Sequence, residues 1–195
     1  MDAGGAFRVT GSISGTGTND ILPTSVTCEG TFLCDYVPAA INGQNAYSGA
    51  VAVSDTATLA INAGKYPTTG AITVNSGTTL QVAQSGTVTL GGNLTFKDGA
   101  ALGFDYTTKD DPVLNLENKT VTFDEGETTN VTVKVTGTAG ARPSRGGTHV
   151  LTSGGKFTDA TVTLVDKPTW VKDISVVNGD IVIDVKSRGT YIYVK

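Results

Sequence analysis

Apolar and polar residues alternate with a period of two along most of the chain, a pattern typical of half-buried β-strands. No window has the i, i+3, i+4, i+7 spacing of an amphipathic helix, because Gly or Thr interrupts nearly every candidate. A double motif of two apolar-x-apolar segments with five residues between them recurs. It occurs at Val51-x-Val53 with Leu59-x-Ile61, at Ile72-x-Val74 with Leu80-x-Val82, and at Leu94-x-Phe96 with Leu102-x-Phe104.

The repeat has a regular length. Val51 precedes Ile72 by 21 residues and Ile72 precedes Leu94 by 22, and a fourth, slightly shorter turn fits Leu114-x-Leu116 with Val121-x-Phe123. Stacked turns of chain would place Val51, Ile72, Leu94 and Leu114 above one another at the strand spacing of about 4.8 Å. We therefore expect an all-β, right-handed parallel β-helix (β-solenoid) with about 20–22 residues per coil. The alternative is an antiparallel β-sandwich, which does not require the motif to return in register.

The same alternation assigns each side chain to the inside or the outside of the stack. The residues expected to point inward are Ile72, Val74, Leu80, Val82, Leu90 and Leu94, and those expected to point outward are Thr73, Thr79, Gln81, Thr87, Thr89 and Thr95. Threonine suits exposed strand positions, because its branched side chain fits the pleat and its hydroxyl meets water. The threonine rows are interpreted as surface, with a ligand-binding ladder as the alternative.

The last third of the chain has longer alternating strands. Val177-Asn178-Gly179-Asp180 predicts a hairpin turn, since Asn-Gly accepts positive φ at both central positions. The sequence thus divides into coils over residues 1–130 and a C-terminal β-cap or continuation over 131–195, where strands can turn antiparallel and cover the open end of the stack. Trp170 is expected to seal that end or a core. We expect one continuous domain, cut from a longer chain.

Charge and composition narrow the classes of partner. The net charge is −4 with no basic patch, which argues against a nucleic-acid partner, and no window of 18 apolar residues could span a membrane as a helix. Cys28 and Cys34 are separated by five residues, and we expect a structural disulfide that pins a loop insertion, with two reduced thiols as the alternative. The single His149 lies far from both cysteines, so no metal site and no cofactor are expected.

Candidates for chemistry are few. His149 lacks a Gly-x-Ser-x-Gly nucleophile motif beside it, so a catalytic role is not expected. Polysaccharide-cleaving β-helices need paired carboxylates, but both acidic groups of this chain lie at expected turns. The candidate carboxylates are Asp105, Asp110 and Asp111, with Tyr106 and Lys109 nearby, and Asp124, Glu125 and Glu127, which lack regular calcium-loop spacing. Arg142 and Arg145 flank a proline and are interpreted as keeping a loop soluble, with contact to an anionic glycan as the alternative.

Residues 42–53, which read NGQNAYSGAVAV, resemble the passenger-associated repeat of bacterial autotransporters. NSGTTLQV at 75–82 is similar to its second half, while Ala46 and Ala50 depart from the usual Thr and Gly. The sequence thus resembles a β-helical passenger segment of a Gram-negative surface protein. The resemblance implies an extracellular or cell-surface location, and a role of the repeat in folding and export of the passenger. It also implies that the parent chain can carry an outer-membrane translocator, which these residues do not include.

We therefore expect a non-catalytic structural or adhesive segment rather than an enzyme. Its expected partners are a host or matrix glycan or protein, and it is not expected to span a membrane. The alternative is a β-helix that binds or cleaves polysaccharide, which would require carboxylates clustered on one face.

Overall fold

The computed structural model describes residues 6–10, 25–28, 31–35, 40–41, 44–45, 50–53, 56–65, 70–124 and 129–187. For the strands before residue 50, it describes the backbone. Within these ranges the chain is built from strands, and its single helical segment is a 3-10 turn at Ala139–Ala141. The all-β class predicted from the alternation is confirmed.

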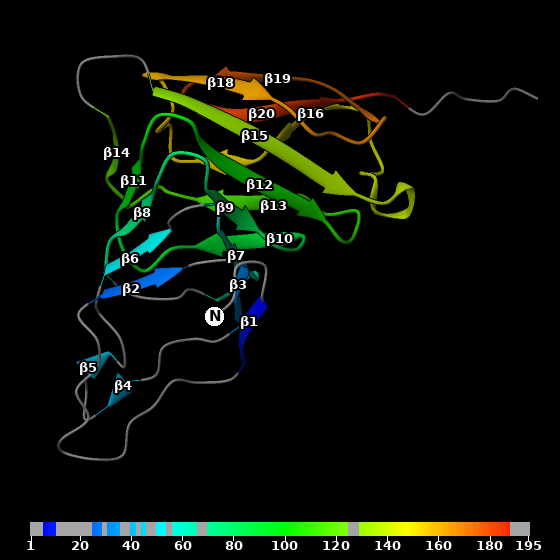
Figure 1. Cartoon of the computed structure of the whole chain (residues 1–195). Helices are drawn as coiled ribbons and strands as arrows, with labels where there is room; N and C mark the ends of the chain where they lie inside the picture. Colours follow the sequence, from blue (N-terminus) through cyan, green and yellow to red (C-terminus); the bar gives the residue numbers. More distant parts are fainter. Residues whose placement is uncertain are drawn as a thin grey trace, which may run out of the picture.

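Three parallel sheets form the body of the molecule (Figure 1). The largest contains, in order, β1 (Ala6–Thr10), β3 (Thr31–Asp35), β7 (Thr58–Ile61), β9 (Thr79–Val82), β12 (Ala100–Tyr106), β15 (Thr129–Gly137) and β18 (Ala160–Leu164). The second contains β14 (Val121–Phe123), β11 (Leu94–Phe96), β8 (Ile72–Val74), β6 (Ala50–Val53) and β2 (Ser25–Cys28). The third contains β10 (Gly86–Thr89), β13 (Pro112–Asn115) and β17 (Thr152–Ser153).

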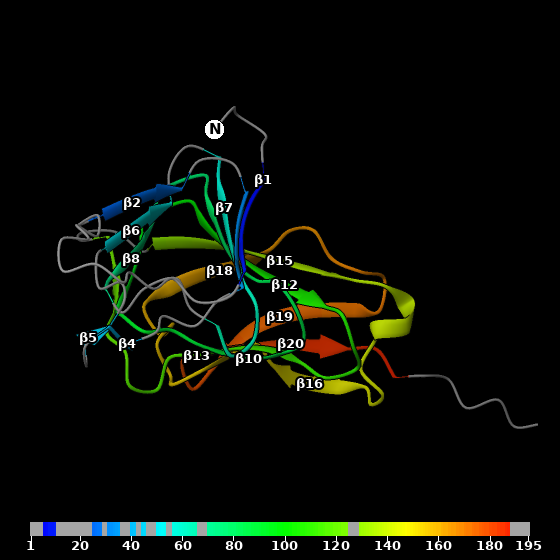
Figure 2. The same ribbon diagram turned by 90° about the horizontal axis from the view of Figure 1, so that it is seen from below.

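The chain visits these sheets in turn. β8, β9 and β10 lie one in each sheet, and β11, β12 and β13 repeat the same order in the next circuit. Viewed from below in Figure 2, β2, β6 and β8 lie on one side of the stack, and β10 and β13 lie on another. A chain that returns to the same sheet after each circuit pairs its strands in parallel. This arrangement is consistent with a β-helix and differs from the antiparallel pairing of a β-sandwich.

The strand register matches the predicted repeat. Val51 pairs with Ile72 and Ile72 with Leu94, while Leu80 pairs with both Leu59 and Leu102. The six residues predicted to point inward are each at most 1% exposed: Ile72, Val74, Leu80, Val82, Leu90 and Leu94. The two motifs of each coil therefore do build one buried apolar column.

The predicted fourth turn is wrong. Leu94 pairs with Val121, not Leu114, and Leu114 instead lies in the third sheet between Val88 and Thr152. The circuit is lengthened by β12, which has seven residues where β9 has four, and by the bend at 107–110. Since the apolar-x-apolar motif occurs in all three sheets, the sequence did not distinguish the third strand of one coil from the first strand of the next.

Turns between the first and second sheets also stack. The Gly77 N–H donates to the Gly99 carbonyl at 3.0 Å, and both glycines have φ near +75°. A residue with a Cβ is strained at this φ, so glycine is required at the same point of successive coils. The turn residues predicted at Asn75-Ser76-Gly77 and Lys97-Asp98-Gly99 thus hold the coils in register.

Three phenylalanine rings fill the column near its C-terminal end. Phe96 and Phe123 stack with ring centroids 6.1 Å apart, and Phe157 packs against both at 5.8 and 5.7 Å. Phe96 and Phe157 are fully buried. Aromatic side chains therefore fill this part of the column.

The outward threonines are exposed or half-buried, with one exception. Thr87 and Thr89 are exposed and Thr73 and Thr95 are intermediate, but Thr79 retains only 7% of its exposure. Its register partner Thr58 and the neighbouring Gln81 line the same hollow on the outer face of the sheet. Thr79 is therefore less exposed than predicted, because side chains of adjacent strands surround it.

The C-terminal region combines both kinds of pairing. β15, β17 and β18 extend the parallel sheets, whereas β16 (Gly147–Val150), β20 (Asp180–Val185) and β19 (Val171–Val177) form an antiparallel sheet. This sheet lies at the end of the stack opposite β1 and β2 (Figure 1). A second antiparallel pair joins β4 (Ala40–Ile41) to β5 (Gln44–Asn45).

The hairpin prediction at the C-terminal sheet is confirmed. Asn178 and Gly179 connect β19 to β20 with φ of 52° and 80°, the positive values that a type I′ turn needs. Trp170 is 5% exposed and packs edge-on against Tyr106, with ring centroids 5.1 Å apart. Trp170 therefore seals a core between the coils and the antiparallel sheet.

We predict that Leu80→Ala lowers the free energy of unfolding by about 2–5 kcal/mol, because it leaves a cavity between Leu59 and Leu102. Thr87→Val is the matched outward control and should change it by less than about 0.5 kcal/mol. Urea denaturation followed by circular dichroism measures both. Equal stabilities of the two variants would contradict the inward assignment of Leu80.

Candidate functional site

Cys28 and Cys34 lie in strands of two different parallel sheets. Cys28 ends β2 and is in register with Val53, while Cys34 lies in β3 and is in register with Ile61. The residues between the two strands, and both cysteine side chains, lie outside the described part. The disulfide and the loop insertion stay predictions, placed where the chain passes from one sheet to the next.

The acidic residues proposed for chemistry have separate partners. Asp105 lies half-buried on β12 and accepts a hydrogen bond of 2.9 Å from the Thr136 hydroxyl. Asp110 is exposed and interacts with Thr108 in the bend that follows β12. Asp105, Asp110 and Asp111 therefore share no hydrogen-bond partner among the described residues. Glu125 and Glu127 lie outside the described residues.

Asp111 is instead the centre of a polar cluster with Tyr106 and His149. The Tyr106 hydroxyl donates to Asp111 Oδ1 at 3.0 Å, and His149 Nδ1 lies 2.9 and 3.0 Å from the two carboxylate oxygens. Tyr106 ends β12, Asp111 directly precedes β13, and His149 lies on β16 of the antiparallel sheet. The cluster thus joins a coil of the stack to the C-terminal sheet.

The geometry of this cluster favours a structural role. His149 Nε2 lies 3.0 Å from the Arg145 carbonyl, so both ring nitrogens are engaged within the protein. Burial, reinforced by the charge of Asp111, raises the pKa of Tyr106, so its hydroxyl keeps its proton and donates to the carboxylate. No nucleophile adjoins the ring in the described contacts. Sequence reasoning considered Asp111 and His149 separately, because 38 residues divide them and no local signal pairs them.

The two arginines of the loop before β16 have different surroundings. Arg142 is half-buried, and its Nη2 donates to the Lys186 carbonyl just after β20. Arg145 is exposed, and its backbone carbonyl oxygen lies within hydrogen-bond distance of His149 Nε2. Only Arg145 therefore has the exposed position that was expected of both residues, while Arg142 fastens the loop to the C-terminal strand.

A second network surrounds the stacked turn at Lys97-Asp98-Gly99. Lys97 Nζ lies 2.7 Å from Asp124 Oδ1, and the Asp98 N–H donates to Asp124 Oδ2 at 2.8 Å. Asp98 in turn accepts bonds from the backbone and side-chain nitrogens of Asn130 at 2.8 and 2.9 Å. The bonds from Asn130 lower the pKa of Asp98, and the bond from Lys97 is the main cause that lowers the pKa of Asp124. Asp124, one of the candidate carboxylates of the sequence, here connects one turn to the next.

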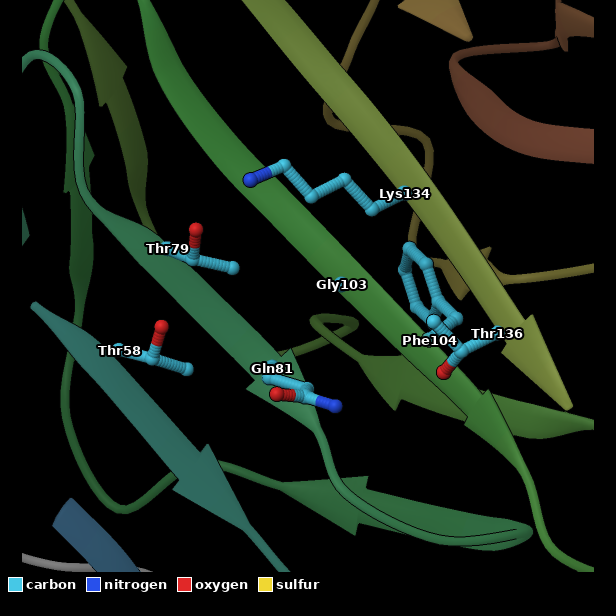
Figure 3. Close-up of a pocket in the computed structure, with 7 residues that line it drawn as sticks. All are labelled: Thr58, Thr79, Gln81, Gly103, Phe104, Lys134 and Thr136. Atoms are coloured by element: carbon cyan, nitrogen blue, oxygen red, sulfur yellow. The ribbon is translucent and has the colours of Figure 1, made fainter. Parts of the chain in front are cut away.

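The outer face of the seven-stranded sheet carries a shallow hollow of about 110 Å³ (Figure 3). Its floor is the backbone at Gly103 in the middle of β12, and the surrounding side chains come from four adjacent strands. The lining residues are Thr58, Thr79, Gln81, Gly103, Phe104, Lys134 and Thr136. The side chains around it carry hydroxyl, amide and ammonium groups, except Phe104, which is fully buried.

Within the part of the chain that the structure describes, no group of three or more His, Cys, Asp and Glu side chains is placed to hold a metal ion. Nor does any helix among these residues have the length and apolar character needed to cross a bilayer. The hollow over Gly103, the Tyr106–Asp111–His149 cluster and the network around Asp98 are all assembled from residues that lie far apart in the sequence.

Comparison of the chain with protein-family models, with curated proteins and with solved structures gives no match. The resemblance to the passenger-associated repeat therefore stays a prediction. Of its leading segment, Gln44–Asn45 and Ala50–Val53 lie in described strands, and the other residues of 42–53 lie outside the description.

We predict that Asp111→Ala lowers the free energy of unfolding by about 1–3 kcal/mol, because Tyr106 and His149 lose their shared acceptor. Asp110→Ala removes a neighbouring carboxylate from the exposed bend and should change stability by less than about 0.5 kcal/mol. Chemical denaturation of both variants measures the difference. An Asp111→Ala protein as stable as the Asp110→Ala protein would show that the cluster does not hold the C-terminal sheet.

We predict that the carboxylate of Asp98 in the stacked turns makes the stability of the protein depend on pH in the acidic range. The folded-state pKa of Asp98 lies below its unfolded value of about 3.9. Asp98 therefore contributes stability above the unfolded pKa, and this contribution is lost as pH falls through the folded pKa. We expect the thermal midpoint to fall below about pH 4, with a shallower fall in Asp98→Ala.

Thermal unfolding followed by circular dichroism between about pH 6 and pH 2 measures this dependence. Asp159→Ala is the control, because Asp159 is exposed and no hydrogen bond to its carboxylate occurs in the described part of the chain. A pH profile that is the same for Asp98→Ala and the unsubstituted protein would contradict the prediction.

Proposed function

We propose that this chain is a non-catalytic structural and adhesive segment of an autotransporter-like protein, secreted or exposed on a bacterial surface. In this proposal the three parallel sheets are the faces of a right-handed β-helix, and the antiparallel sheet covers its C-terminal end. A β-helix of this kind is a stiff spacer, because each coil bonds to its neighbours along the whole axis. Such a spacer displays its outer faces to partners at a distance from the cell.

The observation that carries the proposal is the unbroken buried column in register across successive coils. Val51, Ile72 and Leu94 lie in line, with exposures of 3%, 0% and 0%. The polar groups that could serve catalysis form internal bonds instead, as in the Tyr106–Asp111–His149 cluster. These side chains thus stabilise the stack, which favours a structural function.

A specific observation favours a second candidate, a β-helix that binds carbohydrate. The hollow over Gly103 lies on the outer face of the largest sheet, and hydroxyl, amide and ammonium groups stand among its apolar lining atoms. Binding is favoured over cleavage, because Asp105 accepts its bond from Thr136 whereas Asp111 belongs to the separate cluster. A cleaving enzyme needs two carboxyl groups that face one glycosidic bond.

The proposal is tested by displaying the chain on a bacterium, fused to an outer-membrane translocator. We expect external protease to reach the displayed chain, and the cells to adhere to host epithelium or to immobilised matrix proteins and glycans. Cells that display an unrelated folded β-domain through the same translocator are the control. Adhesion no greater than the control, or the release of sugar fragments from a polysaccharide by the purified chain, would overturn the proposal.

A further inference from the structure

Residues that point outward from neighbouring strands form rows across the seven-stranded sheet. One such row follows the register Ala60, Gln81, Gly103 and Lys134, from β7 through β9 and β12 to β15. Gly103 interrupts the row with a residue that has no side chain. The interruption produces the hollow, with Gln81 on one side and Lys134 on the other.

The backbone at Gly103 does not explain why glycine occupies this position. Gly103 lies within an extended strand and is not among the described glycines with positive φ. A Cβ there would lie 3.0 Å from Gln81 Cγ and 3.4 Å from Thr79 Cγ2, so any side chain would press against the wall of the hollow. Glycine inside a strand costs stability and often marks a bulge, a tight bend, or a place where a ligand or another backbone approaches closely. At Gly103 it keeps the hollow open.

Lys134 supplies the charge at this place. It forms no ion pair among the residues that the structure describes, whereas Lys97 and Lys172 pair with Asp124 and Asp184. The neighbouring Asp105 accepts a bond from Thr136. Figure 3 shows the Lys134 side chain lying across β12, with its ammonium group toward the Thr79 side of the hollow. The cation thus lies over the hollow without an anionic partner among the described groups.

The geometry points to a subsite for one carboxylated sugar unit of an acidic polysaccharide. This inference rests on the proposed surface-exposed, adhesive function and names the ligand class and the site. The Lys134 ammonium would bind the carboxylate, while the Gln81 amide and the Thr79 and Thr136 hydroxyls face the sugar hydroxyls. At about 110 Å³ the hollow is smaller than the roughly 300–1,000 Å³ of enclosed small-molecule pockets, so it fits one unit of a longer chain that lies on the surface.

A saccharide fits this surface better than a peptide does. Extended peptides gain affinity by adding to the edge of a sheet, where backbone groups are unpaired. β12 is an interior strand that bonds to β9 and β15 on its two sides, so its backbone groups are engaged. Recognition at this place depends on side-chain hydroxyl, amide and ammonium groups, which match the hydroxyls and carboxylate of an acidic sugar.

The test is isothermal titration of the purified full chain with hexasaccharides of hyaluronan, alginate and polygalacturonate, each compared with its carboxyl-reduced form. We expect at least one acidic hexasaccharide to bind and its carboxyl-reduced form to bind at least about tenfold more weakly, because a charge-assisted bond is lost. Lys134→Gln and Gly103→Thr should each weaken binding by about tenfold or more. Gly103→Thr restores a strand-forming residue to the row and fills the hollow.

The controls are Lys109→Gln, which removes the same charge from the exposed bend, and Thr163→Val, on the same sheet outside the hollow. Both should bind within about twofold of the unsubstituted chain, and thermal unfolding establishes that every variant is folded. Binding of no acidic hexasaccharide would overturn the inference, while adhesion of the displayed chain tests the proposed function separately. If Lys134→Gln and Gly103→Thr bind as tightly as the unsubstituted chain, the site lies elsewhere. If the carboxyl-reduced sugar binds as tightly as the acidic one, carboxylate recognition is excluded.

Discussion

The parallel register between successive coils is the constraint on which the rest of the structure depends. Each coil buries its inward residues only when the next coil places equivalent residues beside them, as Leu59, Leu80 and Leu102 do. One residue of slippage would move every inward side chain to the outer face, because side chains alternate along a strand. The bonded turns at Gly77 and Gly99 oppose such slippage. Core and turns therefore specify the same alignment.

The same constraint creates the outer surface. Residues between the inward positions must point outward, and the register aligns them across the sheet in rows. A residue without a side chain in such a row, as at Gly103, shapes the surface while the neighbouring Leu102 and Phe104 stay buried in the column. A stacked fold can thus vary its outer face while its interior is preserved.

The C-terminal end of the stack is covered by the antiparallel sheet. A stack of parallel strands ends in an open edge and an exposed column, and both favour association with other chains. Here the antiparallel sheet of β16, β20 and β19 lies at that end, Trp170 packs on Tyr106, and Asp111 holds His149. The buried ring contact supplies apolar area, while the polar cluster orients the sheet relative to the coil. Asp111 and His149, which lie 38 residues apart in the sequence, thus meet where a coil joins the antiparallel sheet.

Alternation and repeat length by themselves determined the all-β class, the inward residues from Ile72 to Leu94, and the hairpin at Asn178-Gly179. These features are local or periodic, so they can be found along one chain. The tertiary structure alone decided that Leu114 belongs to a third sheet, because Val88-x-Leu90 and Leu114-x-Leu116 there carry the same motif as strands of the other two sheets. It also decided that Asp111 meets His149, and that Gln81 and Lys134 flank Gly103. Such neighbours are one coil or more apart, and their distance depends on how long each coil is, which alternation does not encode.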